Sequence, residues 1–286
     1  MKVFFFGMGF SSLAAARAMR TGISTNLPIA GTTRDPEVGN AEFKLHAFDG
    51  KAAGGTLGAD LRRATHLVIS IPPDENGDPV LRNHRSDMDA APDLQWLCYY
   101  STVGVYGDLG GAWIDETAAT HPQNRRSQLR LKVEQEWRDY AARRGVPLLI
   151  LRLAGIYGPG RSSIDKLRAG VARRIIKPEQ VFNRIHVEDI ARITMLAAKA
   201  RLAGTFNLAD DEPAPPQDVI AFAAELIGMP APPGVPFAEA NMTSMARSFY
   251  ADNKRVSNAA IKAALGIELL YPTFREGLRA IHQEHA

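Results

Sequence analysis

Val3-Phe4-Phe5-Phe6-Gly7-Met8-Gly9-Phe10-Ser11-Ser12 opens the chain with an apolar run, a glycine-rich turn and the start of an alanine-rich segment. The run from Val3 to Phe6 is β-branched and aromatic and stops at a glycine, which is typical of a strand buried on both faces of a parallel sheet. The segment from Ser12 to Arg20 has the apolar spacing and alanine content of a helix. The sequence therefore predicts a strand, a tight turn and a helix in direct succession.

The turn itself follows the pattern G-x-G-x-x-G except at its last position, which is Ser12. Gly7 permits the tight turn, and Gly9 lets the backbone approach a pyrophosphate at the helix N-terminus, where free N–H groups favour negative charge. Serine is small enough for close packing of the helix on the strand. We predict that this turn binds a dinucleotide through Gly7, Gly9, Phe10 and Ser11. The alternative is a glycine-rich turn without a ligand.

Short apolar runs alternate with helical patterns as far as residue 153. This alternation indicates βαβ units, right-handed crossovers and a parallel sheet with helices on both faces. The predicted fold class is α/β, a Rossmann-like doubly wound sheet. Further strands are predicted at residues 27–30, 43–48, 67–71, 94–100 and 147–153, and further helices at residues 57–63 and 128–143.

The end of the second predicted strand bears on the choice of cofactor. It reads Gly31-Thr32-Thr33-Arg34, without the acidic residue that usually holds the ribose 2′-hydroxyl of NAD. Arg34 can pair with a 2′-phosphate and the threonine hydroxyls can donate to it, so Thr33 and Arg34 predict NADP rather than NAD. A solvated surface charge is the alternative for Arg34. Ile71, at the end of the fourth strand, is a further predicted cofactor contact.

Composition narrows the class of protein. The net charge is 34 − 31 = +3 and the basic residues are scattered, so no nucleic-acid partner is expected. Trp96, Trp113 and Trp137 are expected in the core. The single cysteine, Cys98, excludes an intrachain disulfide, which suits a reducing, cytoplasmic compartment. No apolar run reaches membrane-span length and no signal sequence precedes the first strand, so we expect a protein without a membrane partner.

Five later segments carry recognisable motifs. Residues 100–107 read YSTVGVYG, residues 151–160 LRLAGIYGPG, residues 183–191 NRIHVEDIA and residues 204–208 GTFNL, and the last segment covers residues 253–278. In this order they resemble segments of the extended short-chain dehydrogenases/reductases, the NAD-dependent epimerase/dehydratase family. The family's first four motifs are S-[ST]-x-x-V-Y-G, L-R-x-x-x-x-Y-G-P-G, x-x-I-H-V-x-D-x-A and G-x-x-[YF]-N-[LV], and the fifth segment is its closing helical region. The resemblance spans nearly the whole chain. It implies a Rossmann-like domain with a smaller C-terminal substrate domain.

The resemblance also implies a catalytic trio, namely a Ser or Thr that bonds the substrate oxygen and a Tyr-x-x-x-Lys on the long helix. Thr102 falls on the Ser/Thr position. Lys132 falls on the Lys position, because the family's Lys is followed four residues later by Glu, here Glu136. Lys132 would hold the nicotinamide ribose. Gln128 stands at the Tyr position, and an amide has no titratable proton. The chain therefore resembles an atypical branch of the family that lacks the Tyr, with Tyr106 as an alternative phenol.

These observations support two functions. The first is an NADP-dependent oxidoreductase or epimerase that acts on a small carbonyl or hydroxyl substrate, such as a nucleotide sugar, bound between two domains. The second is a dinucleotide-binding sensor or scaffold without chemistry. The resemblance places residues 1–155 and about 182–211 in the cofactor domain, and about 156–181 and 212–286 in the substrate domain. It also suggests a homodimer. No metal-ligand spacing is present among the histidines.

Overall fold

The computed structural model describes residues 1–36, 42–51 and 57–284. Their backbone contacts divide the chain into two compact units, each built from three segments. Unit 1 comprises Met1–Thr102, Arg125–Arg152 and Ile190–Phe206, and unit 2 comprises Val103–Asn124, Leu153–Asp189 and Asn207–Ala286.

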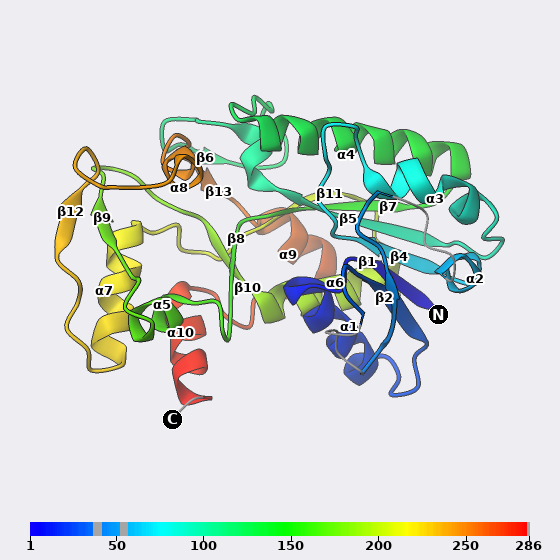
Figure 1. Cartoon of the computed structure of the whole chain (residues 1–286), viewed down its shortest axis with the longest axis horizontal. Coiled ribbons are helices and arrows are strands. Elements are labelled where there is room, and N and C mark those ends of the chain that lie inside the picture. Colours follow the sequence, from blue (N-terminus) through cyan, green and yellow to red (C-terminus); the bar gives the residue numbers. More distant parts are fainter. Residues whose placement is uncertain (37–41, 52–56, 285–286) are drawn as a thin grey trace. The chain divides into compact units, whose positions relative to one another are not determined.

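Unit 1 is built on a seven-stranded parallel sheet of order β11-β7-β5-β4-β1-β2-β3 (Figure 1). The strand order reverses between β1 and β4, which is the point where open α/β sheets bind ligands beyond the carboxyl ends of their strands. This arrangement confirms the predicted Rossmann-like fold. The strands are β1 (Val3–Phe6), β2 (Ile29–Thr33), β3 (Lys44–Ala47), β4 (His66–Ile69), β5 (Trp96–Thr102), β7 (Leu148–Leu153) and β11 (Gly204–Leu208).

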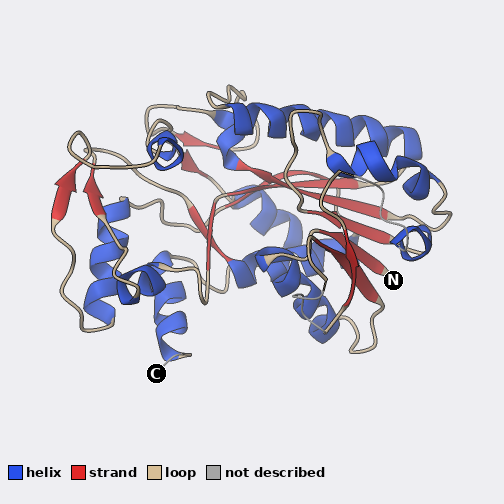
Figure 2. Cartoon of the chain, viewed as in Figure 1, coloured by secondary structure: helices blue, strands red, loops and turns tan. Residues whose placement is uncertain are grey.

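Helices cover both faces of this sheet (Figures 1 and 2). One face carries α1 (Phe10–Gly22) and α6 (Val187–Ala200), and the other carries α2 (Leu57–Arg62), α3 (Pro79–Asp89) and α4 (Arg125–Arg144). None of the helices in the described ranges combines the length and apolar character needed to cross a membrane.

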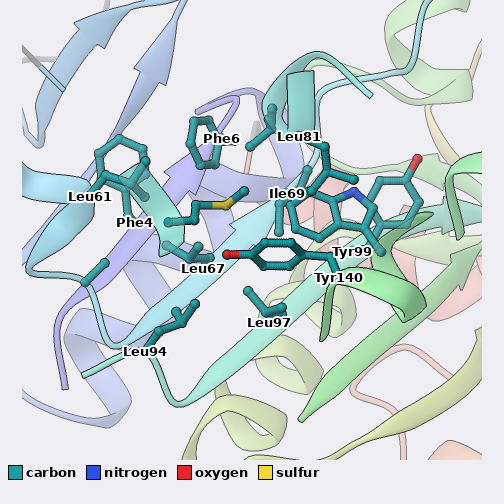
Figure 3. Packing of buried hydrophobic residues seen from close by; sticks show 14 of the residues in the cluster. Phe4, Phe6, Leu61, Leu67, Ile69, Leu81, Leu94, Leu97, Tyr99 and Tyr140 are labelled. Atoms are coloured by element: carbon teal, nitrogen blue, oxygen red, sulfur yellow. The ribbon is translucent and has the colours of Figure 1, made fainter. Parts of the chain in front are cut away.

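The main core of unit 1 lies between the sheet and the helices α2, α3 and α4 (Figure 3). Phe4 and Phe6 alternate with Phe5 along β1, so the first two point into this core and Phe5 points to the opposite face. Trp137 and Tyr140 of α4 are buried against the same cluster. Burial of each such side chain contributes about 1.5–3 kcal/mol, which fixes α4 firmly on the sheet.

Helix α3 was not predicted, because its polar sequence hides the apolar spacing. Its start nevertheless has a clear local cause: the side chain of Asp78 accepts hydrogen bonds from the backbone N–H groups of Val80 and Leu81, at 2.8 and 3.0 Å. Pro79 occupies the first helical position, where a missing N–H costs nothing. The Trp137 indole donates to the second oxygen of Asp78, which ties α3 to α4.

Unit 2 contains three two-stranded parallel pairs, several short helices and two small apolar clusters. The prediction that Trp113 lies in the core is wrong, because its position on a short strand leaves the side chain 59% exposed. The pairs are β8 (Gly155–Tyr157) with β10 (Arg184–His186), β9 (Arg174–Ile176) with β12 (Gly234–Pro236), and β6 (Trp113–Ile114) with β13 (Arg255–Val256). The helices are the 3₁₀ turn Val103–Tyr106, α5 (Ser163–Arg168), α7 (Pro216–Leu226), α8 (Ser244–Phe249), α9 (Ala259–Leu265) and α10 (Phe274–Gln283).

Candidate functional site

The glycine-rich turn leaves β1 at the point where the strand order reverses. Gly7 has φ +91°, a left-handed conformation that favours glycine. A Cβ at this residue would also lie only 2.7 Å from the Ser70 hydroxyl, so there is no room for a side chain. The backbone N–H of Gly7 donates to the Thr32 hydroxyl at 2.9 Å, and that of Met8 donates to the Thr32 carbonyl at 2.7 Å. The turn is thereby held to the end of β2.

Gly9 has the surroundings that a backbone approach requires. It is the N-cap residue of α1, and no side-chain hydrogen bond caps the helix. A Cβ built on Gly9 would meet no atom of the described residues within 4 Å. Among the described residues, no atom therefore fills the space beside Gly9, at the helix end where N–H donors favour an acceptor group.

Ser12, the residue that departs from the glycine pattern, is 1% exposed. Its hydroxyl donates to the Ser70 hydroxyl at 2.9 Å, and Ser70 donates in turn to the Gly7 carbonyl at 2.7 Å. The serine thus replaces the third glycine without loss of packing, because its hydroxyl has a partner at the end of β4. Ile71 is half-buried, and its Cγ1 would lie 3.0 Å from a Cβ on Gly7.

The two threonines at the end of β2, both predicted as donors to the cofactor, differ in burial. Thr32 is fully buried and its hydroxyl already serves Gly7. Thr33 is half-buried, and Arg34 and Asp35 are exposed, so a ligand at this strand end meets a cation and an acid besides the threonine hydroxyl.

The carboxyl end of β5 is attached to α4 and β7 by buried charges. Thr102 is the last residue of β5, and its neighbour Ser101 donates to Glu134 at 2.5 Å. Glu134 is fully buried on α4 and accepts two bonds from Arg152 of β7, at 3.1 and 2.8 Å. Arg138 adds a third ion-pair contact at 3.2 Å and also donates to a threonine of β11. This network fixes the backbone beside Thr102.

Helix α4 places the predicted residues Gln128 and Lys132 on its exposed face. The Lys132 side chain is 66% exposed and pairs with Glu136 at 3.8 Å. Glu134 lies on the opposite, buried face, about 160° away around the helix from Lys132 at 100° per residue. The roles given to Gln128 and Lys132 remain predictions.

Arg130 is a residue of this region that the sequence analysis missed. It lies four residues before Glu134 and therefore on the same side of α4. Its Nη1 donates to the Tyr100 carbonyl at 2.7 Å and to the Tyr99 hydroxyl at 3.2 Å. Burial raises the pKa of Tyr99, and the Arg130 charge opposes that shift. The spacing of Arg130, Glu134 and Arg138 was the available signal.

Two further phenol and imidazole candidates belong to unit 2 and are already engaged there. The Tyr106 hydroxyl is buried and donates to Asn207 at 2.8 Å. His186 is 1% exposed, and its ring packs against Tyr157 and Tyr271. Burial lowers the pKa of His186 to about 4, so the ring is neutral at physiological pH.

Known proteins are similar to this chain in sequence and in fold. Residues 88–209 match the model of the NAD dependent epimerase/dehydratase family. A 3-diazoavenalumate denitrifying reductase from a Streptomyces species is 30% identical over 139 residues, which cover 46% of this chain and 45% of that enzyme. The match thus spans less than half the length of this curated relative.

Two solved structures extend the comparison over the whole chain. A conserved protein of unknown function from Silicibacter pomeroyi is 43% identical, with a TM-score of 0.86 and coverage of 99% of both chains. The dTDP-glucose 4,6-dehydratase of Bacillus anthracis, solved in complex with NAD, is 16% identical. Its TM-score is 0.79, with coverage of 100% of this chain and 96% of that one, which is a likeness of fold.

Proposed function

We propose that this chain, whose residues 88–209 match the NAD dependent epimerase/dehydratase family, binds a nicotinamide dinucleotide and uses it to oxidise or reduce a small hydroxyl- or carbonyl-bearing substrate. The observation that carries the proposal is the turn between β1 and α1, where no atom of the described residues lies within 4 Å of a Cβ built on Gly9. Gly7 to Ser11 would hold the pyrophosphate, and Ile71 would pack against the cofactor. A Streptomyces relative that is a reductase by name supports hydride transfer as the chemistry.

The bound nicotinamide would supply or accept the hydride, and the chain would orient the substrate. Thr102 is proposed to hydrogen-bond the substrate oxygen, because it ends β5 at the carboxyl edge of the sheet. Lys132 remains the proposed contact to the nicotinamide ribose. Gln128 would leave proton transfer to a group outside the Tyr-x-x-x-Lys positions, since its amide does not titrate.

The preferred cofactor is proposed to be NADP. Thr33 can donate a hydrogen bond to a 2′-phosphate, and Arg34 supplies the charge that pairs with it and offsets the exposed Asp35 beside it. Titration of intrinsic tryptophan fluorescence with NADPH and NADH tests this preference. Tighter binding of NADPH is expected, and its loss in Arg34→Ala would identify the arginine. Tighter binding of NADH would overturn the assignment.

Gly9→Val tests the turn separately from the fold. The added side chain meets no described residue within 4 Å of its Cβ, and the backbone at Gly9 is extended at φ −88°. Thermal stability should therefore change little, whereas dinucleotide binding should weaken at least ~10-fold, or about 1.4 kcal/mol. Unchanged binding in this variant would remove the turn from the cofactor site.

A second candidate is a dinucleotide-binding sensor without chemistry. The observation that favours it is the exposed position of Gln128 and Lys132, the two α4 residues aligned with the family's proton-transfer pair. The absorbance of NADPH at its nicotinamide band, followed against a panel of aldehydes, ketones and sugar nucleotides, separates the two functions. Turnover of any panel member supports the enzyme, and tight binding without turnover supports the sensor.

A further inference from the structure

Among the described residues, three of the seven basic side chains of α4 form ion pairs, and Arg130 is one of the four that do not. Arg125 pairs with Glu75, Lys132 with Glu136, and Arg138 with Glu134. Arg130 forms no ion pair with any carboxylate of the described residues, although it lies in the same charged helix. Its two hydrogen bonds go to a carbonyl and a phenol, which are neutral acceptors.

Arg130 is also held in place. Both of its bonds use Nη1, and the guanidinium lies over the Tyr99 ring at 5.5 Å from the centroid. Nε and Nη2 have no hydrogen-bond partner within the part of the chain that the structure describes. A half-buried guanidinium that is fixed on one side and has two donors unused on the other suits an anionic oxygen, which it can bind in a forked geometry.

The position of Arg130 connects it with the candidate site. Its main acceptor, Tyr100, is two residues before Thr102 on β5. The neighbouring Ser101 is bonded to Glu134, one helical turn beyond Arg130 on the same face of α4. The buried Glu134–Arg152 pair therefore keeps α4 in register with the end of β5, and with it the guanidinium.

We propose that Arg130 binds an anionic oxygen, a phosphate or carboxylate, of a ligand held at the carboxyl end of β5. This inference rests on the proposed function for the identity of the site. It specifies the ligand chemistry: the counter-charge for Arg130 comes from the cofactor or from an anionic substrate. Because an arginine stays protonated, its role is to bind and orient, and it transfers no proton.

The test compares four purified full-length variants in two arms. Arg130→Met removes the charge, Arg130→Lys keeps it, Lys132→Met removes the charge predicted for the ribose contact, and Arg143→Met is the matched control at the far end of α4. The first arm measures NADPH dissociation constants by fluorescence. The second measures binding of benzoate, phenyl phosphate and neutral benzyl alcohol by calorimetry, with and without saturating NADPH. Thermal unfolding of each variant reports its stability.

A cofactor phosphate as the partner predicts that Arg130→Met weakens NADPH at least ~10-fold, as expected for a charged hydrogen bond, with Arg130→Lys intermediate. An anionic substrate as the partner predicts the same loss for benzoate or phenyl phosphate, while benzyl alcohol binds weakly to every form. Arg143→Met should stay within about 2-fold throughout, since exposed charges contribute little.

One result would overturn the role of Arg130, namely an Arg130→Met variant that equals wild type in both arms. A loss of NADPH binding in Lys132→Met, with NADPH and anion binding both unchanged in Arg130→Met, is that result. Failure of wild type to bind NADPH or NADH would instead refute the proposed function. The anion arm would still report on Arg130 in that case, so the two failures are distinguishable.

Discussion

Glu134 and Asp210 are both buried carboxylic acids, one in each unit, and their surroundings are opposite. Glu134 is fully buried and accepts hydrogen bonds from Ser101, Arg138 and Arg152, contributed by β5, α4 and β7. Two of these partners are cations, and the Arg152 contact has the forked geometry that stabilises a carboxylate. Glu134 and its partners Ser101, Arg138 and Arg152 thus form a hydrogen-bonded ion-pair network that links α4 to the sheet; we call it the Glu134 network.

Asp210 is 1% exposed, and neither of its carboxyl oxygens has a hydrogen-bond partner with good geometry among the described residues. Burial raises the pKa of Asp210 to about 8, and the Arg184 charge and the Glu212 amide only partly oppose this. Asp210 is therefore largely protonated at neutral pH. The comparison teaches that burial alone does not set the state of a carboxyl group; the donors supplied by neighbouring elements do.

The largest expected effect is on Glu134. Glu134→Gln keeps the volume but removes the buried carboxylate that pairs with Arg152 and Arg138, so the free energy of unfolding should fall by about 3–5 kcal/mol. Urea unfolding at pH 7 measures it. Glu136→Gln is the matched control on the same helix, where the exposed pair with Lys132 should contribute less than about 1 kcal/mol. Equal losses of unfolding free energy in the two variants would contradict a stabilising role for the Glu134 network.

Asp210→Asn should have the opposite sign and depend on pH. The folded protein keeps the Asp210 proton up to pH about 8, whereas the unfolded chain releases it near the ordinary value of 3.8. Folding stability therefore falls as pH rises from about 4 to 8, and the amide removes this loss. Relative to wild type, the variant should gain at least ~2 kcal/mol between pH 4.5 and pH 8, from 1.36 kcal/mol per pKa unit.

Chemical denaturation of both proteins at these two values of pH gives the difference. The wild-type measurement is the internal control, because all other titrating groups are shared. A difference that does not change with pH would mean that Asp210 is charged in the folded state.

Ser101→Ala should have the smallest effect. It removes one of the donors to Glu134 and leaves both arginine contacts, so the loss should be about 1 kcal/mol. Because Ser101 precedes Thr102, the variant should also alter ligand binding at the end of β5 if the Glu134 network positions Thr102. Stability from urea unfolding, with NADPH affinity from fluorescence, separates these effects. A loss as large as that of Glu134→Gln would show that the hydroxyl, rather than the arginines, holds the charge.

Local signals explain most of what could be predicted. The apolar run before Gly7 and the glycine-rich turn after it favour a single local structure. β1, the turn and α1 therefore lie where the sequence predicts them. Helix α3 had a signal too, in the Asp78-Pro79 pair at its start, but its polar composition hid the helical period. Trp113 was predicted to be buried and is exposed, because an aromatic residue alone does not show whether a short strand is covered by other elements.

Taken by itself, the sequence determined the α/β class, the parallel sheet with helices on both faces, and a glycine-rich turn whose conformation depends on the backbone and on the absence of side chains. These follow from local sterics and hydrophobic period. The spacing of Val133, Trp137, Tyr140 and Ala141 marks the buried face of α4. Only the tertiary structure decided that Glu134 joins this face, because no apolar period places a carboxylate there. Glu134 turns inward because Ser101 and Arg152, distant in sequence, provide its donors there, and this brings Arg130 with it.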